Sequence, residues 1–184
     1  MQGKIIIDAH IQTGMLKIGP HCLGTQDVLF SRTMWQVAGN LIIKGHTSFG
    51  RGCKISIGQQ AQLTIGKNFT ITGKSDIICQ KSITFGDNCL LSWDILIMDT
   101  DFHHIYNLDS VAEGEQINIP KAIIIGNHVW IGCRTMILKG VYIGNENVIA
   151  AGSTITRSIN AENCIIGGNG KCVEIIKKEI SWLA

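Results

Sequence analysis

The sequence predicts an all-β protein built as a single-stranded parallel β-helix, in which short strands wind around one apolar core. Isoleucine recurs six times at a spacing of six residues, at positions 125, 131, 137, 143, 149 and 155. Most residues directly after these isoleucines are small, and the chain holds 21 Gly but only 2 Pro. A period of six does not follow one face of an α-helix, whereas residues an even number apart share a face of a strand. Because one strand of such length is implausible, the chain must turn often, which is typical of hexapeptide repeats.

Three faces of six residues each make one coil, so isoleucines three hexads apart should lie above one another. The predicted stacks are Ile125 on Ile143, Ile131 on Ile149 and Ile137 on Ile155. Branched side chains suit the wall of a sheet, and burying each isoleucine contributes roughly 1.5–3 kcal/mol. Backbone groups should pair with the neighbouring coils, about 4.8 Å away.

The length of 184 residues predicts one domain over 1–184. Residues 1–40 show little periodicity, although Lys4–Ile7 could form a first strand and Ile18-Gly19 a degenerate hexad. Regular coils are expected over 41–160. After Asn160 the hexads stop, so residues 161–184 are expected to turn, form one short strand or helical segment, and cap the open end of the coils.

Two irregular intervals interrupt the predicted coils. Ile65 and Phe85 lie 20 residues apart, slightly more than one coil, which predicts a bulged corner. Phe85 and Ile125 lie 40 residues apart, which predicts roughly two coils with extra residues. The excess must fall in the excursion 99–121, which holds two His, five acidic residues and a Tyr. Long loops on a rigid scaffold often carry function, and we expect that here.

Composition narrows the function classes. A net charge of +2 is too small to argue for nucleic acid or for an anionic membrane. No apolar run approaches the ~20 residues of a membrane span, and the N-terminus lacks the pattern of a signal peptide. The seven cysteines form no C-x-x-C pair, so we interpret most of them as reduced core residues. We therefore expect a cytoplasmic protein without a nucleic-acid partner.

The hexads, together with Val129-Trp130-Ile131-Gly132 and Ala151-Gly152-Ser153, resemble the hexapeptide-repeat acyltransferases. That resemblance implies a left-handed helix, a homotrimer with active sites between subunits, and transfer of an acyl group from coenzyme A to a hydroxyl or amine. It is most specific over residues 85–182 and rests on the repeat alone over 41–84. The expected function is an acetyl-CoA-dependent O-acetyltransferase acting on a sugar hydroxyl of a polysaccharide or its precursor.

The excursion supplies the expected catalytic base. Asp101-Phe102-His103-His104-Ile105-Tyr106 is similar to the loop of sugar O-acetyltransferases, which implies that His103 is the base and ranks His104 second. A neutral imidazole suits this step because its unperturbed pKa is near 6.5. Asp101 or Asp99 could orient the imidazole, and the sequence does not choose between them. A backbone N–H is expected to stabilise the oxyanion.

The resemblance also implies where the acyl donor binds. Coenzyme A would follow small residues of the late coils, with Trp130 near the acyl group and cations for its phosphates. The implied cofactor-binding residues are Trp130, Gly132, Cys133, Ala151, Gly152, Ser153, Thr156, Arg157 and Lys171. Corner geometry alone also explains Ala151-Gly152-Ser153. The family usually has Gly-Asn-Pro where this chain has Gly168-Asn169-Gly170, which loosens that turn.

Three alternatives remain open at this point. An N-acetyltransferase of an amino sugar would use the same machinery. A zinc-dependent hydratase of the gamma-carbonic-anhydrase type shares the fold, but the histidines outside the excursion are dispersed, so no metal is expected. A non-enzymatic scaffold or ice-binding solenoid would not need the excursion, and the mixed outward residues Lys67, Asp87, Asn127 and Arg134 argue against it. The acceptor sugar and the length of the acyl group stay undetermined.

Overall fold

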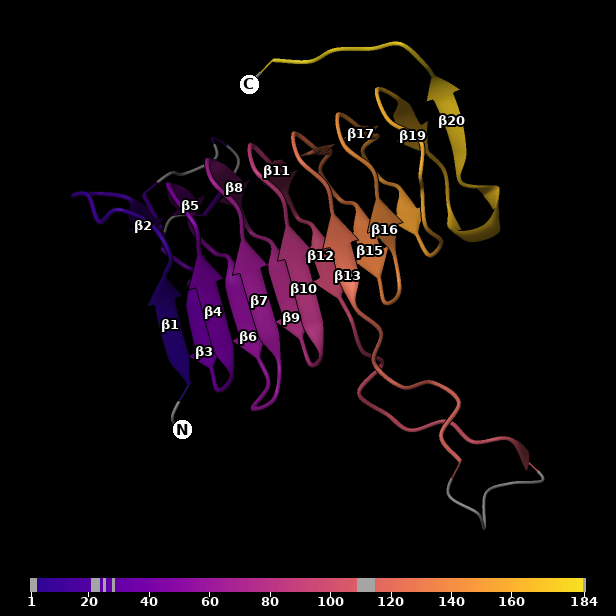
Figure 1. Ribbon diagram of the computed structural model, residues 1–184, viewed down its shortest axis with the longest axis horizontal. Helices are drawn as coiled ribbons and strands as arrows, with labels where there is room; N and C mark the ends of the chain where they lie inside the picture. The colour runs from indigo at the N-terminus through magenta and orange to yellow at the C-terminus, as the bar shows by residue number, and fades with distance from the viewer. Residues whose placement is uncertain (1–2, 21–23, 25, 28, 109–114, 184) are drawn as a thin grey trace.

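The computed structural model describes residues 3–20, 24, 26–27, 29–108 and 115–183. Short strands wind around one long axis as a triangular prism with three parallel sheets (Figure 1). In Figure 1 the chain advances from left to right, rises through sheet A on the side nearer the viewer, and returns through sheets B and C farther from the viewer, which makes the winding left-handed. The predicted fold class, a left-handed parallel β-helix, is confirmed. No helix of the described ranges is long and apolar enough to cross a membrane.

Each sheet collects one strand from successive coils. Sheet A contains β1 (Lys4–Ile7), β4 (Asn40–Ile43), β7 (Gln62–Ile65), β10 (Ser82–Phe85), β13 (Ile123–Ile125) and β16 (Tyr142–Ile143). Sheet B contains β2 (Leu16–Ile18), β5 (Thr47–Phe49), β8 (Phe69–Gly73), β11 (Leu90–Trp93), β14 (Trp130–Ile131), β17 (Val148–Ile149), β19 (Ile165–Gly167) and β20 (Glu174–Lys177). Sheet C contains β3 (Met34–Val37), β6 (Lys54–Ile57), β9 (Asp76–Cys79), β12 (Leu96–Met98), β15 (Met136–Leu138) and β18 (Thr154–Ile155).

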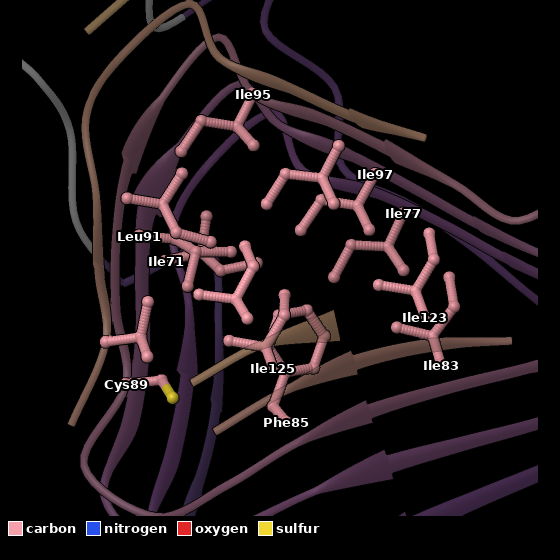
Figure 2. Packing of buried hydrophobic residues seen from close by; sticks show 14 of the residues in the cluster. Ile71, Ile77, Ile83, Phe85, Cys89, Leu91, Ile95, Ile97, Ile123 and Ile125 are labelled. Atoms are coloured by element: carbon pink, nitrogen blue, oxygen red, sulfur yellow. The ribbon is translucent and has the colours of Figure 1, made fainter. Parts of the chain in front are cut away.

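The three predicted isoleucine stacks are present in the register of the late coils. Ile125 pairs with Ile143, Ile131 with Ile149, and Ile137 with Ile155. All six side chains are buried. The inward-facing apolar residues of β4 to β19 form a single core, part of which is shown in Figure 2.

Aromatic rings fill part of the interior of the early coils. Phe49, Phe69 and Phe85 occupy successive coils, with ring centroids 5.7 and 4.8 Å apart. Trp35 packs edge-on against Phe49 at 5.1 Å. Four of the described cysteines are buried, as expected for core residues, and burial raises the pKa of the Cys79 thiol to about 12. Cys22 lies outside the described residues.

The interval between Phe85 and Ile125 differs from the expectation of roughly two coils. β10 pairs directly with β13, with Phe85 opposite Ile125, so the interval is one coil plus the excursion. The excursion leaves the prism after β12 and rejoins it before β13, without adding a strand to any sheet. The spacing alone misled because two coils and one coil with a long loop need similar numbers of residues.

The coils also reach beyond the ends of the sequence repeat. β1, β2 and β3 form a first coil within residues 4–37, where the sequence showed little periodicity. At the other end, β19 stacks on β17 after the last hexad. The chain then forms the 3₁₀ helix η2 (Gly170–Cys172) and folds back as β20, which is antiparallel to β19 and covers the end of sheet B.

Three corners join the sheets, and each repeats from coil to coil. The A–B corner comprises residues 44–46, 66–68, 86–89, 126–129 and 144–147. The B–C corner comprises 50–53, 74–75, 94–95, 132–135 and 150–153. The C–A corner comprises 58–61, 80–81, 139–141 and 156–158, and the excursion leaves it between β12 and β13. The C-terminal residues run back along the A–B corner (Figure 1). There Trp182 stacks on His128 at 4.1 Å and donates its Nε1–H to the His128 carbonyl at 3.1 Å.

Candidate active site

The excursion from the C–A corner projects away from the prism as an irregular hairpin (Figure 1). Its two limbs meet at an antiparallel bridge between Tyr106 and Gln116, and Ile117 N–H donates to Ile105 O at 2.9 Å. Lys121 N–H donates to Asp99 O at 3.0 Å and closes the base of the hairpin. The middle of the excursion, residues 109–114, lies outside the described residues. The described limbs are held by hydrogen bonds that begin at the prism.

The Asp99 carboxylate binds backbone N–H groups of the C–A corner and does not orient an imidazole. Its carboxylate is fully buried and accepts backbone N–H groups of Gln80, Lys81 and Ser82 at 2.7, 2.8 and 2.8 Å. These three donors belong to the turn of the preceding coil, whose polar groups would otherwise be unpaired. The sequence left Asp99 and Asp101 as candidates for orienting the His103 imidazole. Asp99 instead fixes the start of the excursion to the preceding coil.

Asn118 is the centre of a hydrogen-bond network that we call the loop latch, formed by Asp101, His103, Asn118 and Lys139. The Asn118 side chain is 8% exposed. Its Nδ2 donates to Asp101 Oδ2 at 2.9 Å and to the His103 carbonyl at 2.7 Å. Its Oδ1 accepts Ile105 N–H at 2.8 Å. One amide therefore joins both limbs of the hairpin at the residue predicted to be the base.

Lys139 ties this network to the next coil. It lies in the C–A corner after β15, and its ammonium donates to Asp101 Oδ2 and, at 3.0 Å, to the Asn118 carbonyl. The hydrogen bond from Lys139, together with that from Asn118, holds the pKa of Asp101 below its usual range. Asp101 is thus a fixed anion of the loop latch, and its described partners do not include the His103 ring.

The two histidines of the excursion differ in their surroundings. Both are exposed, and His103 N–H donates to the Asp101 carbonyl at 2.7 Å. The preceding residue, Phe102, has a positive φ of 61°, a rare conformation for a bulky residue that is associated with functional sites. His104 Nδ1 lies 3.2 Å from the Tyr106 hydroxyl. The His103 backbone is fixed on both sides while its imidazole stays accessible.

Five of the nine residues expected to contact the acyl donor lie at the B–C corner, and two of these five have structural roles there. A Cβ on Gly132 would lie 2.6 Å from Ala151 N, so glycine there is required by the stacking of coils. Ser153 is buried and donates to Ala150 O at 2.7 Å. Ala151 and Gly152 are exposed, nothing lies within 4 Å of a Cβ on Gly152, and Cys133 is half-buried. Corner geometry explains Gly132 and Ser153, and the open surface is provided by the other three.

The remaining predicted donor residues lie further apart. Trp130 is 37% exposed on the outer face of sheet B, where its Nε1–H donates to Ser92 Oγ at 3.2 Å. Thr156 and Arg157 belong to the C–A corner, and the Arg157 guanidinium donates to Val173 O. Arg157 also lines a hollow of about 300 Å³ beside β20. Lys171 is exposed on η2.

The expected base and the expected donor surface therefore occupy different corners of one chain. His103 lies at the C–A corner, whereas Cys133 and Ala151 lie at the B–C corner. These two corners are the opposite edges of sheet C. Among the described residues, no group of three His, Cys, Asp or Glu side chains is placed to hold a metal ion.

Sequence reasoning missed Asn118 and Lys139. Asn118 is a lone polar residue in the otherwise apolar run Ile117-Asn118-Ile119, and this break in the pattern was the available signal. Lys139 carries no such signal, because a lysine at a corner looks like any solvated surface charge. Its role depends on which corner faces the excursion.

Comparison with known proteins places this architecture among acetyltransferases. Residues 122–157 match the family described as bacterial transferase hexapeptide (six repeats). A polysialic acid O-acetyltransferase of Escherichia coli O1:K1 / APEC is 33% identical over 144 residues, covering 78% of this chain and 42% of the relative. A galactoside O-acetyltransferase of Escherichia coli (strain K12) is 35% identical over 99 residues, covering 54% of this chain and 47% of the relative. This chain thus spans less than half the length of these curated relatives.

Solved structures share the fold over most of the chain. The crystal structure of the polySia-specific acetyltransferase NeuO superimposes with a TM-score of 0.60 and 25% identity, covering 99% of this chain and 69% of the other. A galactoside acetyltransferase in complex with coenzyme A gives a TM-score of 0.55 and 29% identity, covering 70% and 60% of the two chains.

Proposed function

We propose that this chain, a hexapeptide-repeat protein related to the sugar O-acetyltransferases, transfers an acetyl group from acetyl-CoA to a hydroxyl of a glycan. The observation that carries the proposal is the loop latch, which fixes the backbone at His103 while leaving the imidazole accessible. The coenzyme A complex of the related galactoside acetyltransferase supports the choice of donor. The described cysteines are all free, which fits a reducing compartment, and we place the reaction in the cytoplasm.

In the proposed reaction His103 acts as the general base. Its neutral imidazole takes the proton of the acceptor hydroxyl while the oxygen attacks the thioester carbonyl carbon. A backbone N–H stabilises the resulting tetrahedral oxyanion. The intermediate collapses with cleavage of the carbon–sulfur bond, and the coenzyme A thiolate leaves and receives the proton from the imidazolium. The products are the acetyl ester and free coenzyme A, and no covalent enzyme intermediate is required.

We propose further that the active site forms between chains of a homotrimer. If the outer faces of sheet C pack around a threefold axis, the B–C corner of one chain lies beside the C–A corner of the next. His103 would then face the donor surface of its neighbour. The outer rows of sheet C are partly apolar, including exposed Met136 and half-buried Leu96, Met98 and Leu138, which supports burial of this face.

Release of coenzyme A thiol from acetyl-CoA, followed with a panel of hydroxyl and amino sugars, tests the function. We expect turnover with hydroxyl acceptors and a loss of at least 100-fold in kcat for His103→Ala. His104→Ala is the matched control and should change kcat less than fivefold. Turnover restricted to amino sugars would replace O-acetylation by N-acetylation, and full activity of His103→Ala would remove His103 from the mechanism.

A further inference from the structure

The C-terminal strap, residues 178–183, runs from the end of β20 back along the A–B corner (Figure 1). Within residues 174–183, Trp182 alone is buried, at 8% exposure. The strap is also tied to the corner by Ile180 N–H, which donates to Asn163 O at 3.0 Å. β20 already covers the end of sheet B, so the strap is not needed to protect the open end of the coils. What the strap does is place one large aromatic side chain at a defined point of the corner.

The corner beneath Trp182 is rigid. His128, Glu146 and Asn163 occupy the same place in successive coils, and all three have left-handed backbones, with φ of 53°, 59° and 56°. His128 Nδ1 lies 2.5 Å from Glu146 Oε2 and donates to this carboxylate. The Trp182 ring stacks on the imidazole with an interplanar angle of 9°. Because the carboxylate of the next coil fixes the imidazole, Trp182 rests on a support that belongs to two coils.

Trp182 also packs against Trp130, the residue expected near the acyl group. The two ring centroids lie 6.1 Å apart with an interplanar angle of 43°, within the range of favourable aromatic pairs. Trp130 precedes Gly132, where the B–C corner begins, by two residues. Its indole is thus held by two contacts, the hydrogen bond to Ser92 Oγ at 3.2 Å and the Trp182 ring, while part of it stays exposed beside the expected donor surface.

From these contacts we infer that Trp182 is a positioning residue for acyl-donor binding, which acts by holding the Trp130 indole in place. The inference rests on the proposed function, because it takes the surface beside Trp130 as part of the donor site. Without Trp182 a single hydrogen bond to Ser92 would hold an indole that turns about two side-chain torsions. The donor would then have to order the indole as it binds, and this ordering weakens binding.

Nuclear magnetic resonance of the indole N–H groups tests the positioning directly. The chain has 4 Trp, whose indole signals can be assigned by substituting each tryptophan in turn. In Trp182→Ala we expect the order parameter of the Trp130 indole to fall from about 0.85 to below about 0.6. Trp182→Phe keeps a ring on His128 and should leave the Trp130 indole ordered. Leu183→Ala, at a 94% exposed position of the same strap, is the matched control and should leave it unchanged.

Steady-state kinetics then tests the consequence for the proposed reaction. We expect Trp182→Ala to raise KM for acetyl-CoA roughly tenfold, with kcat and KM for the acceptor within about threefold of the parent enzyme. A purely structural role would lower the folded fraction, and hence the apparent kcat, without changing KM for acetyl-CoA. In a Trp130→Ala background, Trp182→Ala should not raise this KM further, because Trp182 acts through Trp130.

Four outcomes would overturn the inference: an ordered Trp130 indole in Trp182→Ala, an unchanged KM for acetyl-CoA in that variant, additive effects of Trp182→Ala and Trp130→Ala, or equal disorder of the indole in Leu183→Ala. The indole measurement needs neither acetyl-CoA nor an acceptor, so it separates the two proposals. Failure of transfer with every acceptor would reject the acetyltransferase function, whereas the order parameter still decides whether Trp182 positions Trp130.

Discussion

Asn118→Ala tests whether the loop latch positions the proposed base. The substitution removes four hydrogen bonds of a buried amide: to Asp101, to the His103 carbonyl, from Ile105 and from Gln116. A neutral hydrogen bond contributes about 1 kcal/mol net and one to a carboxylate about 1.5–3 kcal/mol, with incomplete additivity. We take the free energy lost from the excursion in this variant as about 3 kcal/mol in total, which corresponds to roughly a 100-fold drop in kcat/KM.

The assay is thiol release at saturating and subsaturating acceptor, combined with thermal melting. The excursion lies outside the packed coils, so its loosening should change Tm by less than about 2 °C. Gln116→Ala is the matched control, because it removes one neutral bond at 3.1 Å from the same amide and should cost about fivefold. An Asn118→Ala enzyme within threefold of the parent in kcat/KM would refute the reasoning, as would a large fall in Tm with unchanged turnover per folded molecule.

Four further outcomes follow from the same structure. Asp99→Ala leaves three backbone N–H groups without their acceptor, so we expect about 3 kcal/mol of destabilisation and a Tm lower by roughly 6–12 °C in thermal denaturation. The pKa of Asp101 is lowered in the folded chain. Its pair with Lys139 therefore stabilises the excursion at every pH above the usual Asp pKa of about 3.9, and this stabilisation is lost as pH falls through the lower pKa of the folded chain. Amide exchange of residues 102–106, corrected for intrinsic rates, should accelerate below about pH 4. In the proposed trimer, Met136→Lys on sheet C should dissociate the subunits in sedimentation and abolish activity, whereas Ile124→Lys, similarly exposed on sheet A, should leave them assembled. Metal analysis should find zinc well below one per chain, with turnover unaffected by chelators; stoichiometric zinc would favour the hydratase alternative.

The repeat could be predicted from sequence because each hexad repeats the same local pattern of inward and outward residues. An isoleucine every six residues fixes which side chain points inward, and parallel pairing then fixes the register of the next coil. The first coil was predicted only in part, as a strand at Lys4–Ile7 and a degenerate hexad at Ile18, because exposed isoleucines such as Ile5 and Ile6 lack the inward periodicity of the later strands. The excursion could be located but not shaped, since its contacts join residues with no periodic relation, such as Asn118 and Asp101.

In the candidate site, too, local motifs could be predicted from sequence, whereas contacts between residues distant in sequence could not. His103 was predicted because its motif is local in sequence, whereas the distinction between Asp99 and Asp101 depends on three dimensions: one carboxylate turns into the corner of the preceding coil and the other meets Lys139 of the next. The expected donor residues are also local motifs, yet they fall on the corner opposite His103. A rigid prism cannot bring two of its own edges together. The separation that counts against an active site within one chain therefore argues for a site shared between two chains, and assembly and turnover should be lost together.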